Sequence, residues 1–349
     1  MRYFRGCRSG FLTGFITFIV VVGCPGFMQA ASSDDVVAAA KKEGVIEFYA
    51  PSTLTLPGAQ ALAEGVNKKY GLNIKLYYNP SGSMPKDIAK LVGLAASGVP
   101  PEWDLMCTTD AHQAPLWSKK LHQTFDYRVL GVDPKVILYD GGAVSFANQI
   151  VLPAYNRKLV APKDIPQRWE DLLDPKWRGK LAVTDATHHL ARLAAGAWGE
   201  EKTTNFVKAL TKQNLMLGRL GEIYNRLLLG EVLVSVTMND SQMHAGRHKG
   251  APIVFAEQVT PVVAPAYIAG VPKGAKHPHV AYLFAAFLTT TEGQKIWEKT
   301  SGATSAFIPG TEAYKFAQGK KLVLMEQEQA GMIERLAVEY GKILGFGGL

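Results

Sequence analysis

The sequence predicts an α/β protein of two lobes, each a mostly parallel sheet flanked by helices, with the lobes joined by crossing hinge strands. Along residues 45–107, short apolar segments alternate with segments of helical period, which is typical of parallel strands joined by helical crossovers. Further along, two long extended apolar segments, 144–156 and 260–270, lie where the chain would enter a second lobe and leave it again. The 349 residues are enough for two such lobes.

In the expected first lobe, glycine residues mark helix ends. A helix over 35–43 should end at Gly44, and a helix over 57–70, with apolar residues at helical spacing, should end at Gly71. A third helix is expected over 86–96. Three segments are apolar or alternate as strands do: 45–50, 72–78 and 103–107.

The second lobe repeats this pattern. Strands are expected over 180–184 and 231–237. One helix is expected to follow the segment 185–189 and to run through Trp198. Two more are expected over 201–212 and over 222–229, and the last should end at Gly230. We assign residues 31–149 and 266–349 to lobe one and residues 150–265 to lobe two.

Residues 1–30 have the features of an export signal. Arginines precede an apolar run over 11–22 that is too short to span about 30 Å of hydrocarbon. Two interpretations of its end stay open. Cleavage near Ala30 would release a soluble secreted protein, whereas Cys24 lies in a segment similar to a lipobox and would carry a lipid anchor. In both cases the mature chain leaves the cytoplasm, and we expect it in the periplasm.

The positive charge of the chain does not predict nucleic-acid binding. The formal net charge is +8, but losing Arg2, Arg5 and Arg8 with the signal leaves 35 basic and 30 acidic residues, a net charge of +5. The remaining basic residues are scattered, and no stripe of them is interleaved with aromatic residues. We therefore expect no nucleic-acid partner and a mild bias toward anionic solutes.

Sequence motifs for catalysis and for cofactors are missing. No Gly-x-Ser-x-Gly stands at a strand–helix turn, and no glycine-rich phosphate loop of the Walker or dinucleotide type occurs. Cys7, Cys24 and Cys107 have no close pair, which excludes a disulfide-dense scaffold and a zinc ribbon. We expect neither an enzyme nor a bound cofactor, although an enzyme on a similar two-lobed fold stays open.

Polar residues follow each of the first three expected strands, where each strand gives way to a helix. In open parallel sheets, ligands bind outside the carboxyl ends of the strands, and helix N-termini offer unpaired N–H groups. Each of these residues has a second interpretation, as an N-cap of the helix that follows. The candidate ligand-binding residues of lobe one are Ser52, Thr53, Ser81, Gly82, Ser83, Thr109 and Asp110.

The order of several short motifs resembles the bacterial extracellular solute-binding proteins, the periplasmic receptors of ABC importers, and most closely their ferric-iron-binding-like branch. These motifs are Ala38–Val45, Ser81–Ser83, Tyr155-Asn156, Trp169–Lys180, Gly230–Val232, His277–Ala281 and Phe287–Gln294. The resemblance spans residues 36–310. It implies the type II periplasmic-binding fold and a receptor that closes on a small solute and delivers it to an inner-membrane permease. We expect the receptor to be monomeric.

The residues that would complete the site from lobe two are Thr187, His188, Asn239 and Asp240. Together with the lobe-one hydroxyls they favour a small anionic solute. Asp110 and Asp240 would repel a bare anion. They could instead bind an ammonium group or a cation, or cap helices, so a zwitterionic solute fits as well as a plain anion.

Ferric iron is the alternative ligand. Members of the iron-binding branch usually carry two adjacent tyrosines in the loop that here reads Met238–Gln242, which has no tyrosine. The adjacent Tyr77 and Tyr78 are expected within a strand, where alternation sends their rings to opposite faces. His188 and His189 could cap a helix, bind the solute, or join a metal site with Asp185 or Asp240. We assign no metal ligands.

Overall fold

The computed structural model describes residues 32–346. The expected signal peptide, including Cys24, lies outside these residues. No helix within them is long and apolar enough to cross a membrane.

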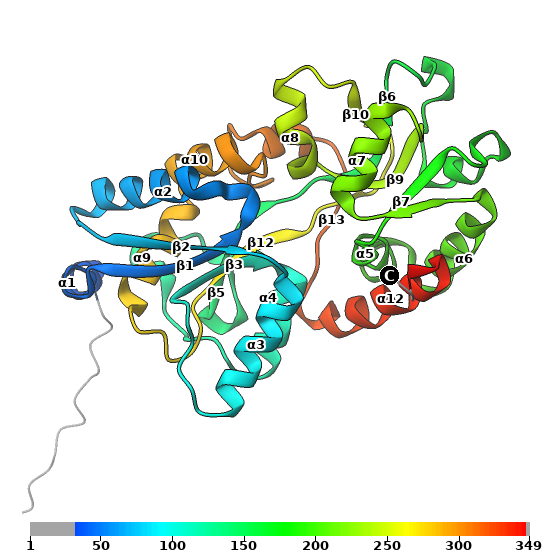
Figure 1. Cartoon of the computed structure of the whole chain (residues 1–349). Coiled ribbons are helices and arrows are strands. Elements are labelled where there is room, and N and C mark those ends of the chain that lie inside the picture. Colours follow the sequence, from blue (N-terminus) through cyan, green and yellow to red (C-terminus); the bar gives the residue numbers. More distant parts are fainter. Residues whose placement is uncertain (1–31, 347–349) are drawn as a thin grey trace, which may run out of the picture. The chain divides into compact units, whose positions relative to one another are not determined.

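The first sheet has six strands in the order β2-β1-β3-β12-β5-β4 (Figure 1). Strand β1 pairs in parallel with β2 and β3, whereas β12, β5 and β4 add antiparallel pairs. The expected parallel arrangement of the first three strands is therefore confirmed within a mixed sheet. The strands are β1 (Val45–Pro51), β2 (Lys75–Ser81), β3 (Leu105–Thr109), β4 (Ile137–Leu138), β5 (Ala143–Asn148) and β12 (Ala266–Gly270).

The second sheet follows the order β13-β11-β6-β9-β7-β8, with β10 paired to β6. Strand β7 pairs in parallel with β8 and β9, and β6 pairs antiparallel with β9, so this sheet is also mixed. Its strands are β6 (Val151–Asn156), β7 (Leu181–Thr184), β8 (Met216–Gly218), β9 (Val234–Asn239), β10 (Ile253–Phe255), β11 (Val262–Val263) and β13 (Leu322–Val323).

Helices flank both sheets, and each sheet has its own apolar core. On the first sheet these are α1 (Ser33–Glu43), α2 (Thr55–Tyr70), α3 (Met84–Ala96), α4 (Asp110–Ser118), α9 (Pro278–Leu288) and α10 (Thr291–Ser301). On the second they are α5 (His188–Leu193), which continues as a π-helical turn over Ala194–Trp198, α6 (Glu200–Leu210), α7 (Leu220–Leu229), α8 (Asp240–His248) and α12 (Ala330–Leu344). The short helix α11 is Glu312–Ala317.

Short 3-10 turns fill the connections: Ser52–Leu54, Tyr127–Leu130, Pro134–Val136, Tyr139–Gly141, Pro162–Asp164, Trp169–Leu173, Pro175–Trp177, Thr211–Gln213 and Gln327–Gln329. The predicted helix ends at Gly44, Gly71 and Gly230 are confirmed. All three adopt left-handed conformations, with φ of 64°, 62° and 75°, which glycine reaches without steric cost.

The two extended segments are the crossings between the sheets. The chain passes from β5 in the first sheet to β6 in the second, and returns from β11 to β12. Trp169, fully buried, donates its indole N–H to the carbonyl of Pro261 at 3.0 Å. The tryptophan motif of the second lobe thus anchors the segment that leads into the return crossing.

The last part of the chain lies with the second sheet. Strand β13 pairs with β11, and α12 packs against α5 and α6, as Figure 1 also shows. This differs from the expected assignment of residues 266–349 as a whole to lobe one. We propose lobe boundaries near residues 149 and 265, with a third passage into lobe two before β13.

Two strands end later than expected. Strand β2 covers 75–81 rather than 72–78, and β3 covers 105–109 rather than 103–107. The reason for the first is the ladder with β1, which runs from Val45↔Lys75 to Pro51↔Ser81. Ser81 and Thr109 are consequently the last residues of strands rather than loop residues.

Candidate functional site

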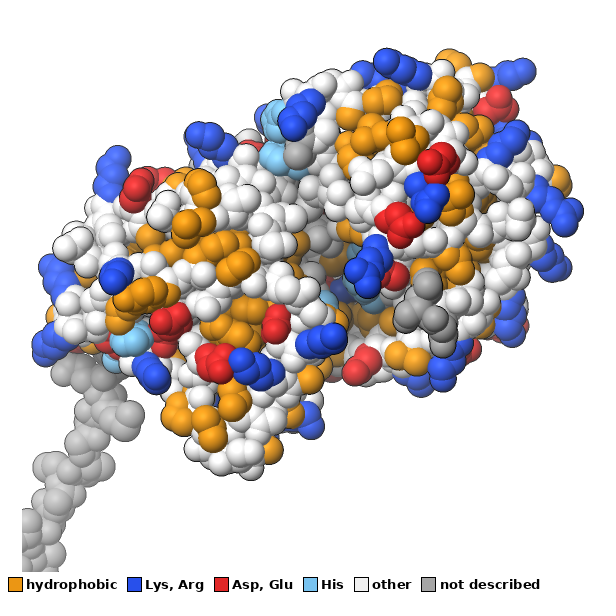
Figure 2. Space-filling model, in the orientation of Figure 1, with side chains coloured by type: hydrophobic (Ala, Val, Ile, Leu, Met, Phe, Trp, Pro, Cys, Tyr) orange, Lys and Arg blue, Asp and Glu red, His pale blue; other side chains and the backbone are white. Residues whose placement is uncertain are grey.

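The carboxyl ends of β2, β1 and β3 lie along one edge of the first sheet, because these neighbouring strands are parallel. That edge faces the second lobe, since Asp110, the residue after β3, contacts Arg192 of α5. Helix α5 itself follows the carboxyl end of β7. The strand ends of both lobes therefore meet, as expected, and Figure 2 shows the surface hollowed where the lobes adjoin.

Among the lobe-one candidates, three hydroxyl groups are uncommitted. Ser52 and Thr53 are exposed and Ser83 is half-buried. Within residues 32–346 their side chains make no hydrogen bond, and Ser83, although it is the N-cap residue of α3, does not cap that helix with its hydroxyl. Gly82, directly before Ser83, is exposed. The capping interpretation thus does not account for these hydroxyls.

Two other lobe-one candidates are held by neighbours. The hydroxyl of Tyr49 lies 2.7 Å from Ser81 Oγ and 2.7 Å from Asp87 Oδ2, which ties Ser81 into the lobe. Thr109 is the N-cap residue of α4, yet its hydroxyl bonds His112 Nδ1 at 2.7 Å instead of capping the helix.

The lobe-two candidates mostly serve their own lobe. Thr187 donates its hydroxyl hydrogen to the carbonyl of Ala337 in α12 at 2.7 Å. Asn239 caps α8 by accepting the N–H of Gln242 at 2.8 Å. Asp240 accepts the N–H of Ser241 at 2.9 Å. His188 is half-buried and lies beside His189, with ring centroids 4.4 Å apart.

The dominant charged contact of the site is the ion pair between Asp110 and Arg192. The two side chains are 3% and 0% exposed, and they come from α4 of one lobe and α5 of the other. Arg192 also donates from Nη1 to the carbonyl of His188 at 3.3 Å. Asp110 therefore already has its counter-ion.

Three histidines surround this pair and are kept neutral. Burial and, as the second cause, the Arg192 charge lower the pKa of His112 to about 4, against the opposing effect of Asp110. Burial, with Arg192 as the second cause, lowers the pKa of His189 to about 3. The pKa of His188 lies well below its usual value because of burial, with contributions from His189, Arg192 and His112. A buried guanidinium disfavours further positive charge nearby.

Asp240 lies in a different environment. Burial raises the pKa of its carboxyl to about 7, while hydrogen bonds from the Ile150 and Ser241 backbone oppose that rise. It lines a cavity of about 480 Å³ next to β10 and α8, together with Arg157 and Arg247. A larger cavity, of about 1250 Å³, adjoins Asp110 and is lined by Tyr139, Ala266, Leu322 and residues 324–329.

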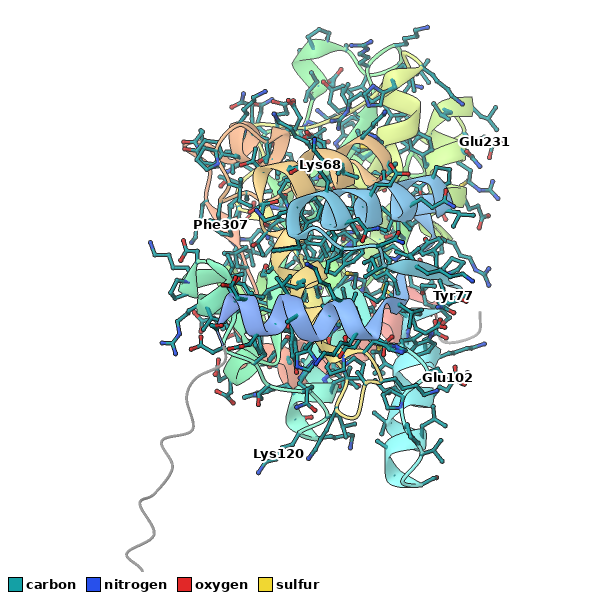
Figure 3. The ribbon with its side chains drawn as sticks, turned by 90° about the vertical axis from the view of Figure 1, so that its left-hand side faces the viewer. Lys68, Tyr77, Glu102, Lys120, Glu231 and Phe307 are labelled. Atoms are coloured by element: carbon teal, nitrogen blue, oxygen red, sulfur yellow. The ribbon has the colours of Figure 1, made fainter. Side chains whose placement is uncertain are left out.

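The two adjacent tyrosines lie as expected. Tyr77 is 43% exposed and points outward (Figure 3), whereas Tyr78 packs on the first core and donates its hydroxyl hydrogen to the carbonyl of Pro51 at 2.8 Å. Among residues 32–346, no three His, Cys, Asp or Glu side chains come together as a metal site.

The sequence interpretation missed Arg192 and His112. Arg192 had a signal, because it is the only charged residue between Asp185 and Glu200. A lone charge within an otherwise apolar helix needs a buried partner or a ligand. His112 follows Asp110 by two positions and carries no comparable signal.

The comparison with known families decides the identity of the chain. The family model for bacterial extracellular solute-binding proteins matches residues 46–300. The chain belongs to this family. Solute-binding proteins of this kind are the receptors of ABC importers, which implies an exported location. No curated protein matches the sequence.

Several solved structures share the fold. Iron-bound HitA from Pseudomonas aeruginosa has a TM-score of 0.68 and 19% identity, covering 86% of this chain and 99% of its own. AfuA from Actinobacillus pleuropneumoniae, with fructose-6-phosphate bound, has a TM-score of 0.65 and 20% identity, covering 86% and 98%. FutA from Trichodesmium, in complex with iron and citrate, has a TM-score of 0.67 and 16% identity, covering 87% and 99%. These receptors have the type II periplasmic-binding fold, so the predicted fold class is confirmed.

Proposed function

We propose that this receptor captures a small anionic or zwitterionic organic solute between its lobes and passes it unchanged to its membrane permease. Ser52, Thr53 and Ser83 would donate hydrogen bonds from lobe one, next to the N-termini of α2 and α3. Hydroxyls without a hydrogen-bond partner beside helix N-termini suit a carboxylate or a phosphate group.

The observation that carries this proposal is the neutralisation of Asp110 by Arg192. A free carboxylate at this position would repel an anion. Asp240 repels an anion less than an ordinary aspartate would, because its pKa of about 7 leaves it about half protonated near neutral pH. Because the charge of Asp110 is compensated and that of Asp240 is reduced, the hydroxyls of Ser52, Thr53 and Ser83 are the groups that we expect to bind the solute at the strand ends.

The charges on the visible surface support a solute rather than a polyanion as the ligand. Figure 2 shows Lys and Arg side chains dispersed among Asp and Glu, with no continuous basic stripe. We further propose that the receptor acts as a monomer. Whether Cys24 carries a lipid or is removed with the signal is decided by the mass of the mature N-terminus, because the lipidated form also retains the residues between Cys24 and Ala30.

The experiment is a titration of the unliganded mature protein with carboxylates, sugar phosphates and phosphonates. Binding is measured by calorimetry and by the shift of the melting temperature. Ligand binding to the folded state raises the melting temperature by mass action. Ser83→Ala should weaken binding of the best solute about 10- to 100-fold, as expected for a lost hydrogen bond to a charged group.

Ser97→Ala is the matched control. Ser97 lies at the other end of α3, where its hydroxyl donates to the carbonyl of Gly93 at 3.1 Å. It should leave the affinity unchanged. Equal affinities of the two variants would remove Ser83 from the site. Titration with ferric citrate and with polyamines tests the other ligand classes, and tight binding of either without any anionic solute would refute the proposal.

A further inference from the structure

The pair formed by Asp110 and Arg192 joins two lobes that must separate for a solute to enter. Asp110 is the first residue of α4, on the first sheet, and Arg192 lies in α5, on the second. Both side chains are withdrawn from solvent, with 3% and 0% exposure. Opening the lobes would therefore break a buried ion pair and hydrate both charges.

The Asp110 carboxylate is fixed within lobe one by two backbone groups. Its Oδ1 accepts the N–H of Ala111 at 2.7 Å, and its Oδ2 accepts the N–H of Ala266 at 3.1 Å. Ala266 is the first residue of β12, directly after the return crossing. One carboxylate thus holds the start of α4, the end of the crossing and, through Arg192, the opposite lobe.

Arg192 makes few contacts besides this pair. Its Nη1 donates a long hydrogen bond to the carbonyl of His188, and its Nε has no partner within residues 32–346. Because the guanidinium is fully buried, its charge depends on Asp110 for compensation. The arginine is therefore stabilised by the neighbouring lobe more than by its own.

The equivalent acid of lobe two shows no such bridge. Asp240 follows β9 as Asp110 follows β3, and it also touches a crossing segment, since its N–H donates to the carbonyl of Ile150 at 3.0 Å. Yet within the described residues it forms no ion pair. The bridge is specific to Asp110 and is not a general feature of the strand ends.

We propose that Asp110 and Arg192 form a clasp that holds the lobes together without solute and thereby sets the affinity for it. Both are positioning residues: they act on the equilibrium between open and closed lobes rather than by touching the solute. A ligand that binds the closed form gains affinity in proportion to the fraction already closed. This inference rests on the receptor function of the family and not on the charge of the solute.

The test measures lobe separation in the solute-free mature protein. Spin labels at Lys86→Cys in α3 and Leu229→Cys in α7, both exposed, report the distance between lobes. We expect a single short distance in the wild-type background. Arg192→Met and Asp110→Asn should each add a longer-distance population. The affinity for the carboxylate, sugar phosphate or phosphonate that binds best in the titration above should fall about tenfold in the single variants.

Lys202→Met is the matched control. It breaks the pair between Lys202 and Glu170, 2.8 Å apart, which lies at the surface of one lobe, and it should leave the distance unchanged. If R192M does not fold, D110N carries the test, because asparagine keeps the shape of the side chain. The clasp is refuted if the wild type is already open without solute, or if folded R192M and D110N keep the short distance. Neither result depends on which solute binds.

Discussion

Asp110 and Arg192 lie 82 positions apart in the chain, yet their charges meet in a buried ion pair between two separate cores. Asp110 accepts the N–H of Ala266 at the end of the return crossing, and Arg192 lies in α5, so the pair connects this crossing to the opposite lobe. This relationship has consequences for stability as well as for binding.

Removing the arginine should destabilise the fold. Removing one partner of a buried ion pair lowers the free energy of unfolding by about 3–5 kcal/mol. We expect a loss of about 3 kcal/mol in R192M, because opening of the lobes lets water reach Asp110. Urea denaturation followed by circular dichroism measures this loss. The double variant D110N/R192M should recover part of it, because no uncompensated charge remains. A loss in R192M no larger than in K202M, below about 1 kcal/mol, would contradict the burial of the pair.

Protonation of Asp240 should make stability depend on pH. Its pKa of about 7 in the folded state exceeds the ordinary value of 3.8, so the folded protein binds this proton more tightly than the unfolded chain. The stabilisation is present below about pH 4 and is lost as the pH rises to about 7. Asp240→Asn removes this dependence, so its stability relative to wild type should rise across that range by up to about 4 kcal/mol. Parallel stability curves for the two proteins would show that Asp240 titrates normally.

The histidines beside Arg192 should act in the opposite direction. His112 has a pKa of about 4 in the folded state against 6.5 ordinarily, so the unfolded chain binds protons more readily between these values. Stability present above about pH 6.5 is therefore lost as the pH falls toward 4. His112→Asn should remove about 1.4 kcal/mol of this loss per pH unit. The same change at exposed His248 serves as the control and should leave the slope as it is in the wild type; an equal effect of both variants would refute the assignment.

Packing of α2 against α9 makes Gly65 sensitive to substitution. A Cβ at Gly65 would overlap Phe287 Cζ, so Gly65→Ala should cost about 1–3 kcal/mol of unfolding free energy. Gly93 in α3 has open space around it, and Gly93→Ala should stabilise the protein by about 0.5–1 kcal/mol. Thermal denaturation of the two variants compares them directly, and effects of the same sign would contradict the packing described for α2.

Local patterns were sufficient to predict much of the fold. The glycine stops at Gly44, Gly71 and Gly230, the parallel first strands and both crossings follow from periodicity and from the properties of single residues. The two-residue strand β13 has no period to detect, which is why the return of the chain to the second sheet was not predicted. The ends of β2 depend on pairing with β1, a partner that local sequence does not specify.

The site was harder to predict than the fold. Sequence patterns placed Ser52, Thr53 and Ser83 at strand ends, but they could not separate these hydroxyls from Ser81 and Thr187, which are bonded to Tyr49 and to α12. Those bonds join segments 32 and 150 positions apart. The pairing of Asp110 with Arg192 is likewise a tertiary contact, and only the lone charge in an apolar helix hinted at it.

The most direct test of the proposed ligand class is native mass spectrometry of the ligand-stripped mature receptor after incubation with a small-molecule extract of the periplasm. We predict one bound organic anion or zwitterion per chain, with a mass that disappears in the S83A variant and persists in S97A. A bound iron atom, a polyamine, or no bound solute at all would contradict this account.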